Sequence, residues 1–146
     1  MSFFIKELTQ DILQSHSDGF FATLRNLTQA EDISLEKSQE ILKQMNAQWT
    51  HIFVAIHEDG NIVGSTSIMI EQKFIRSWAL AAHVEDVVTR EWYQWQGIAS
   101  ALMNHVVQIA KEKKCYKIIL DCDDNLIWYY EKFWFTHKGA YMNQYL

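Results

Sequence analysis

The sequence of 146 residues contains no proline, only five glycines and only two cysteines. Without proline, its turns and helix ends must depend on glycine, asparagine and aspartate. Cys115 and Cys122 flank one short predicted strand, and at about 3.3 Å per residue they would lie roughly 20 Å apart. Because that separation exceeds the span of a disulfide, we expect two free thiols.

Positive charge is also scarce, with 13 lysines and arginines against 18 acidic residues and a net charge of −5. This balance, with no basic stripe, argues against nucleic acid or an anionic membrane surface as partner, and favours a small-molecule substrate. No apolar run approaches the roughly 20 residues of a membrane span, and the start lacks a secretory signal pattern, so we expect a cytoplasmic protein. The six histidines show no metal-ligand spacing, so we expect no metal.

Apolar residues make up 49% of the chain and aromatic residues 14%, enough for a substantial core. No repeat, low-complexity segment or linker interrupts the sequence, so we expect one domain over residues 1–146. Strands are predicted over residues 3–8, 51–56, 61–71, 116–122 and 141–146, with one more beginning at Ala82. Helices are predicted over residues 9–27, interrupted near 15–19, and over 35–46, 98–114 and 126–133.

Residues 72–81 have no clean period and are predicted as a loop or a strand end. Ser34 is predicted to cap the helix at 35–46, and Asp123, Asp124 and Asn125 offer caps for the last helix. The turn sequence 58–61 predicts an antiparallel hairpin, whereas the strand–helix–strand unit from Ala82 onward predicts a parallel pair. The fold class is therefore α/β, with a mixed sheet and helices on its faces.

The stretch from Ala82 to Lys114 contains the clearest functional signal. Its apolar residues recur at the spacing of one buried helix face: Ile98, Ala101, Leu102, Val106, Ile109 and Ala110. His105 interrupts that face and is predicted to be a core or interface histidine. A turn around Gly97 leads from the strand into this helix, so free amides and the positive end of the helix dipole would face an anion, most often a phosphate. An ordinary strand-to-helix turn is the alternative.

The turn from Gln94 to Ala99 also fits the pattern Gln/Arg-x-x-Gly-x-Gly/Ala, and together with the element order it resembles the GNAT superfamily of acetyl-CoA-dependent N-acetyltransferases. Further segments resemble one family within it, the eukaryotic glucosamine 6-phosphate N-acetyltransferases. They are His83-Val84-Glu85-Asp86-Val87-Val88, Tyr93-Gln94-Trp95-Gln96-Gly97, the run from Ile109 to Cys122, and Tyr129-Tyr130-Glu131-Lys132. The resemblance is continuous from about Ile70 to Lys132 and looser before it, where Arg25-Asn26-Leu27-Thr28 still fits.

This resemblance implies a GNAT acyltransferase fold, a mixed, mostly antiparallel sheet flanked by helices with a parallel pair splayed at the acetyl-CoA site. The residues it implies for acetyl-CoA are Val87, Val88, Thr89, Gln94, Trp95, Gln96, Gly97, Ile98, Ala99 and Ser100. Those it implies for the amino-sugar phosphate are Thr28, Lys73, Phe74, Ile75, Arg76, Glu85, Asp86, Val87, Tyr116, Lys117 and Asp121. The resemblance also implies a homodimer whose C-terminal strand completes the partner's site.

The implied catalytic residues are Glu85, Asp121 and Tyr130. Paired carboxylates at Glu85 and Asp86 suit the ammonium of an amino sugar, with a solvated acidic edge as the alternative. Asp121 ends a predicted buried strand, where it would position or deprotonate the amine. Tyr130 would return a proton to the CoA thiolate, and of the pair with Tyr129 one side chain is expected to pack while the other faces the cofactor. Cys122 as an acetylated nucleophile is a weaker alternative.

The resemblance implies acetyl transfer from acetyl-CoA to glucosamine 6-phosphate by direct attack of the amine. The chain departs from the family in three places. Trp95 and Trp134 occupy positions where relatives often have glycine, so Trp95 must point outward if its amide is to serve a pyrophosphate. The segment 142–146 lacks the basic residue that relatives place near Gln144 or Tyr145. These departures leave open a GNAT enzyme for another amine, such as a polyamine or a protein N-terminus, or a non-catalytic CoA-binding protein.

Overall fold

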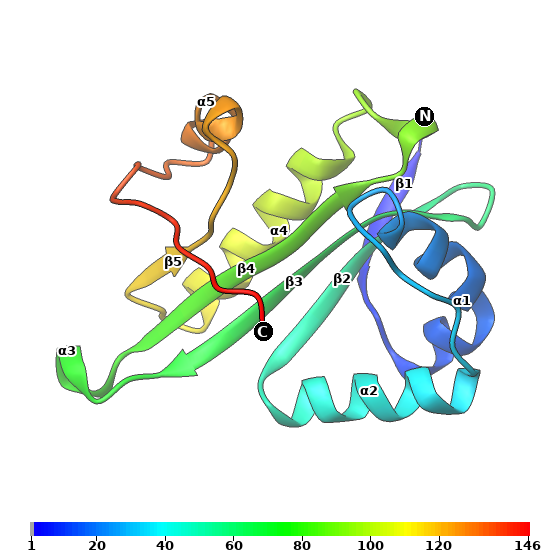
Figure 1. Cartoon of the computed structure of the whole chain (residues 1–146), viewed down its shortest axis with the longest axis horizontal. Coiled ribbons are helices and arrows are strands. Elements are labelled where there is room, and N and C mark those ends of the chain that lie inside the picture. Colours follow the sequence, from blue (N-terminus) through cyan, green and yellow to red (C-terminus); the bar gives the residue numbers. More distant parts are fainter. Residues whose placement is uncertain (1) are drawn as a thin grey trace.

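The computed structural model describes residues 2–146 and contains one five-stranded sheet with the strand order β1-β2-β3-β4-β5. The first three neighbouring pairs are antiparallel and β4 pairs with β5 in parallel (Figure 1). The strands are β1 (Phe3–Glu7), β2 (Thr50–His57), β3 (Ile62–Gln72), β4 (Leu80–Thr89) and β5 (Lys117–Ile119). The helices are α1 (Gln10–Leu24), α2 (Leu35–Ala47), α3 (Ile75–Trp78), α4 (Ile98–Glu112) and α5 (Ile127–Glu131), with short 3-10 turns η1 (Glu91–Tyr93) and η2 (Asp124–Leu126). The predicted mixed sheet, its hairpin and its parallel pair are confirmed.

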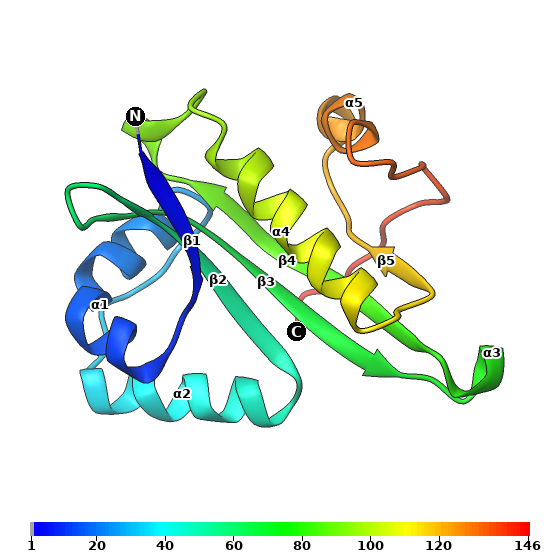
Figure 2. The same cartoon turned by 180° about the vertical axis from the view of Figure 1, so that it is seen from behind.

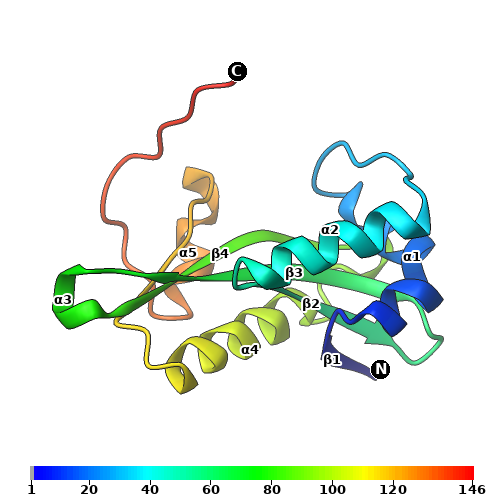
Figure 3. The same cartoon turned by 90° about the horizontal axis from the view of Figure 1, so that it is seen from below.

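The helices cover the two faces of the sheet unequally. Helices α1 and α2 lie over one face and α4 over the other (Figures 2 and 3). One apolar cluster joins α4 to the sheet through residues such as Leu102 and Val106, and a second joins α1 and α2 to it through Leu13 and Leu42. Amphipathic helices on both faces of a sheet are the arrangement that the apolar periodicity predicts.

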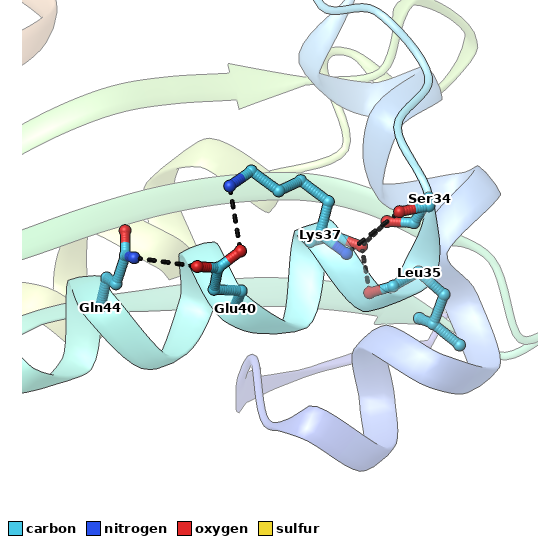
Figure 4. Close-up of polar contacts among 6 residues, drawn as sticks. Ser34, Leu35, Lys37, Glu40 and Gln44 are labelled. Carbon is cyan, nitrogen blue, oxygen red and sulfur yellow. Dashed lines mark hydrogen bonds and ion pairs between the residues drawn. The ribbon is translucent and has the colours of Figure 1, made fainter.

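Local sequence accounts for the starts of helices α1 and α2. The Ser34 side chain accepts a hydrogen bond from the amide of Lys37 at 3.1 Å and caps α2, as predicted (Figure 4). Thr9 caps α1 in the same way, and the predicted interruption of that helix occurs at His16, whose backbone leaves the helical region. The structure therefore confirms both helix starts and the irregularity in α1.

Gly64 allows α4 to lie directly on the sheet. A Cβ atom at this position would come within 2.5 Å of a methyl group of Ile98 and 3.1 Å of Leu102. Since Ile98 begins α4, this contact fixes the amino end of the helix against β3. The absence of a side chain at Gly64 thus positions the turn that precedes α4.

The predicted strands near the C-terminus are wrong in extent. The strand expected over residues 116–122 covers only Lys117–Ile119, and its residues are exposed or half-buried rather than buried. The strand expected over 141–146 does not form, and the C-terminal segment extends away from the sheet (Figure 3). Both segments have strand-like composition, but β5 is an edge strand with a neighbour on one side only, and the tail has no pairing partner in this chain.

Three other expectations are corrected. Residues 72–81 contain the single turn of α3 and the beginning of β4, which starts at Leu80 rather than Ala82. The last helix is split into η2 and the short α5, and no side-chain hydrogen bond caps either of them. Helix α4 ends at Glu112, two residues earlier than predicted.

Both cysteines are free thiols. None of the helices within residues 2–146 has the length and apolar character of a membrane span.

Candidate active site

A β-bulge interrupts β4 where the carboxylates were predicted. The register passes from Ser65 opposite Val88 to Ser67 opposite Glu85, so Asp86 and Val87 together oppose a single residue of β3. Asp86 adopts a left-handed backbone with φ of 53°. A bulge leaves backbone groups without hydrogen bonds to the neighbouring strand and redirects side chains. Backbone groups near Val87 are therefore available to bind a ligand.

The parallel pair separates beside this bulge. Strand β5 ends at Ile119, which pairs with His83, while β4 continues six residues further to Thr89. From Val84 onward, this edge of β4 therefore has no strand neighbour, although β3 still pairs on the other side. The two strands of the parallel pair thus diverge at the level of Glu85 and Asp121, as the fold prediction requires.

Two carboxylates at this divergence act on a third, Glu85. The pKa of Glu85 is raised, first by partial burial and then by the negative charges of Asp121 and Asp86. His83 opposes the shift, being positive when protonated. Asp121 itself is exposed, contrary to the prediction that it ends a buried strand. The structure therefore brings Glu85, Asp86 and Asp121 together, and Glu85 is the group best suited to hold a proton.

A second polar cluster lies on β3 and β4 next to these carboxylates. Glu71 accepts a hydrogen bond from Lys73 at 2.6 Å, and its other oxygen contacts His83 at 2.6 Å. These two bonds lower the pKa of Glu71, with the Lys73 bond as the larger cause. Lys73, predicted to contact substrate, is thus already paired within the chain.

The turn before α4 has the features of an anion site. Gly97 has a left-handed backbone with φ of 80°, and no side chain caps the helix that follows. The first-turn amides are therefore left for a ligand. Gln96 Oε1 and Thr89 Oγ1 are shielded from solvent without a hydrogen-bond partner among the described residues. Trp95 points outward with 97% of its surface exposed, as predicted.

The two tyrosines of α5 have different environments. Tyr130 is 9% exposed and packs in the cluster under α4, and burial is the first cause that raises its pKa to about 12. Tyr129 is half-buried, and its hydroxyl lies 3.3 Å from Ser100 Oγ in the first turn of α4. The structure therefore joins α5 to the candidate anion site through Tyr129 and keeps Tyr130 protonated.

Two of the predicted substrate residues form a cationic group around one ring. The Arg76 guanidinium lies 5.5 Å from the centre of the Tyr116 ring, and the Lys117 ammonium lies 5.4 Å from it. Neither forms an ion pair within residues 2–146. Lys117 pairs with Ala81, four residues or about 13 Å along β4 from Glu85, so Lys117 lies near the start of β4 and the carboxylates lie near its middle.

The remaining predicted substrate residues lie further from the carboxylates. Phe74 and Ile75 are exposed at the tip between β3 and β4. Thr28 is exposed just after α1, in a segment that reaches the loop before α4 through a hydrogen bond from the Glu91 amide to Asn26. The structure therefore does not gather all of these residues at one point of a single chain.

Two side-chain contacts at the site had not been predicted. The Tyr93 hydroxyl donates to Asp59 at 3.1 Å, which ties the loop before α4 to the β2–β3 turn. The stacking of Arg76 on Tyr116 is the other. A tyrosine shortly before Gly97 is a weak sequence signal for the first contact, and the sequence has no signal for the second.

The bulge in β4, the divergence of the parallel pair and the uncapped start of α4 agree with the predicted acyltransferase fold. Residues 10–135 match the model of the acetyltransferase (GNAT) family, so the chain belongs to that family. A probable glucosamine 6-phosphate N-acetyltransferase from Oryza sativa is 32% identical over 132 residues, covering 87% of this chain and 80% of that protein.

Two solved structures are close to this one over nearly the whole chain. The glucosamine-6-phosphate N-acetyltransferase of Arabidopsis thaliana superimposes with a TM-score of 0.92 at 28% identity, covering 99% of each chain. An acetyltransferase from Trypanosoma brucei gives a TM-score of 0.93 at 30% identity, covering 99% of this chain and 100% of that one. These structures confirm the predicted fold class.

Proposed function

We propose that this enzyme transfers an acetyl group from acetyl-CoA to the amine of glucosamine 6-phosphate, giving N-acetylglucosamine 6-phosphate and CoA. The proposal rests on the grouping of Glu85, Asp86 and Asp121 at the divergence of the parallel pair, together with the uncapped start of α4. Carboxylates suit the amine of the sugar, and the helix start suits the pyrophosphate of the cofactor. The names of its relatives support the same substrate.

The residues of the turn fit acetyl-CoA as the acetyl donor. Gln94 to Ser100 would hold the pyrophosphate through backbone amides, and the left-handed Gly97 leaves that approach free of a side chain. Val87, Val88 and Thr89 follow the bulge and would line the pantetheine arm. Bound there, acetyl-CoA supplies a thioester carbonyl that an amine can attack.

In the reaction, the neutral amine attacks the thioester carbonyl directly. Glu85, with its raised pKa, and Asp121 accept the proton that the amine loses, directly or through water. The Val87 amide at the bulge donates a hydrogen bond to the developing oxyanion. The C–S bond then breaks, and Tyr130, protonated because its pKa is about 12, gives its proton to the CoA sulfur.

We assign the sugar phosphate to Arg76 and Lys117. These cations lack an acidic partner in the described chain, whereas Lys73 is neutralised by Glu71. Their stacking on Tyr116 holds both charges in one place, which favours a doubly charged phosphate. They replace the basic residue that the C-terminal segment lacks.

We further propose that the enzyme is a cytoplasmic homodimer and that its product is used to synthesise UDP-N-acetylglucosamine. The C-terminal residues Tyr145 and Leu146 are almost fully exposed, and the tail lies away from its own sheet. A second copy offers the pairing partner that this segment lacks. In such a dimer the tail completes the neighbouring site.

A polyamine acetyltransferase is the second candidate, because three carboxylates in one group also suit a polycation. An assay of free-thiol release from acetyl-CoA distinguishes the two candidate functions. Glucosamine 6-phosphate, glucosamine and a polyamine are supplied in parallel reactions. Fast release with the sugar phosphate alone supports the proposal. Equal rates with glucosamine contradict the phosphate assignment, preference for the polyamine favours the second candidate, and no turnover with any amine favours a CoA-binding protein without catalysis.

A further inference from the structure

Trp95 is both exposed and conformationally unfavourable. Its backbone has a φ of 65°, a left-handed value that disfavours residues with a Cβ atom, and 97% of its surface is exposed. The indole gains almost no burial within its own chain to offset the backbone cost. A large apolar side chain held in this way gains stability only when something else covers it.

The left-handed backbone alone does not mark a ligand, because Trp49, Trp78 and Trp134 share it. Trp95 differs from them in position. It lies two residues before Gly97, within the turn whose amides face the pyrophosphate in the proposed function. If this turn holds the pyrophosphate, an indole on its outer side is within reach of the nucleotide end of acetyl-CoA, because the pyrophosphate joins the pantetheine arm to adenosine.

The loop that carries Trp95 is fastened to two other parts of the chain. Tyr93 donates a hydrogen bond to Asp59 in the β2–β3 turn at 3.1 Å, and its ring lies 5.2 Å from that of His57. The Glu91 amide donates to Asn26, just after α1. These contacts order the loop before any ligand arrives, so binding to the indole requires little further loss of loop entropy.

We propose that Trp95 stacks on the adenine ring of acetyl-CoA and so binds the nucleotide end of the cofactor. This inference rests on the proposed function and adds a specificity residue to it. Adenine is flat and polarisable, and base stacking on an exposed aromatic side chain needs no hydrogen-bond match. Trp95 thereby adds affinity at the end of the cofactor furthest from the thioester.

The test compares the dissociation constants of acetyl-CoA and of S-acetyl-pantetheine, which lacks the nucleotide, in the wild type and in Trp95→Gly. Glycine adopts the left-handed backbone readily, so the variant folds. We expect acetyl-CoA to bind about tenfold more weakly to the variant, a typical loss for one stacked base. The affinity for S-acetyl-pantetheine stays unchanged, and Trp95→Phe retains part of the lost affinity.

Trp134→Gly is the matched control, because Trp134 has a φ of 68° and is 94% exposed but follows α5 instead of preceding α4. It keeps the wild-type affinity for both donors. Wild-type affinity of Trp95→Gly for acetyl-CoA, or an equal loss for both donors, overturns the inference while leaving the proposed function intact. Failure of the wild type to bind acetyl-CoA overturns the proposed function and the inference with it.

Discussion

Glu85 combines partial burial with two acidic neighbours, and both conditions disfavour its charged form. A carboxylate with a raised pKa holds a proton more readily than an ordinary one, which suits a group that must accept a proton from an ammonium. It must nevertheless be ionised to act. Turnover therefore falls when the pH decreases through the raised pKa of Glu85.

Replacement of one acidic neighbour tests this electrostatic coupling. Asp86→Asn removes a negative charge that raises the pKa of Glu85, so the pKa falls and the acidic limb of kcat/KM against pH moves to lower pH. Glu112→Gln, at the far end of α4, serves as a control with an unshifted limb. A limb that stays in place in Asp86→Asn, or moves to higher pH, contradicts the coupling.

Tyr130→Phe removes the proposed proton donor but keeps the aromatic ring in the core. We expect kcat to fall about 100-fold, within the usual range for general acid catalysis, while the affinity for CoA is retained. Tyr129→Phe, which loses only the contact with Ser100, is the comparison and should retain most of the turnover. Full activity of Tyr130→Phe in steady-state assays would show that another group protonates the thiolate.

Arg76→Ala tests the phosphate assignment. A hydrogen bond to a charged group contributes about 1.5–3 kcal/mol, so KM for glucosamine 6-phosphate should rise roughly tenfold or more. KM for glucosamine, which lacks the phosphate, should not change. Lys138→Ala, an exposed cation elsewhere, is the control. An equal effect on both sugars would place the phosphate elsewhere.

At the scale of elements, the contact between α4 and β3 at Gly64 sets the position of the cofactor turn. Gly64→Ala would force a methyl group against Ile98 and Leu102, so we expect a loss of about 1–3 kcal/mol in the free energy of unfolding. Urea denaturation measures it. Gly139→Ala is the control, because an added Cβ there has no neighbour within 4 Å, and its free energy of unfolding should be nearly unchanged. Equal stability of the two variants would show that α4 can shift to make room for the methyl group.

Elements with strong local signals were predictable from the sequence. The Ser34 cap, the turn at 58–61 and the apolar face of α4 each follow from residue type and spacing. The length of β5 and the conformation of the C-terminal segment could not be predicted, because a strand forms only beside a neighbouring strand, which the local sequence does not reveal. The single turn of α3 is too short to produce a period.

The candidate site shows the same limit. Glu85 and Asp86 are adjacent in sequence, and Asp121 follows the strand predicted to lie beside them, so their grouping could be predicted. The contacts of Arg76 with Tyr116 and of Tyr93 with Asp59 join side chains from separate elements. Such pairs depend on how loops fold over the sheet, which hydrophobic periodicity does not encode.

For the whole molecule, the exposed C-terminal segment is the feature that a single chain leaves unexplained. Deletion of residues 141–146 removes the segment that we propose to pair with a second copy. Sedimentation should show a dimer for the full chain and a larger monomer fraction for the deletion variant. A full chain that stays monomeric at every concentration would contradict the dimer.

In the proposed reaction, this site moves an acetyl group from sulfur to the amine of glucosamine 6-phosphate. The most direct measurement is nuclear magnetic resonance of the sugar after reaction with acetyl-CoA that is isotopically labelled in its acetyl group. We predict one labelled N-acetyl group on the sugar for each CoA released. Label that appears only as free acetate, or that stays on the protein, would contradict direct transfer to the sugar amine.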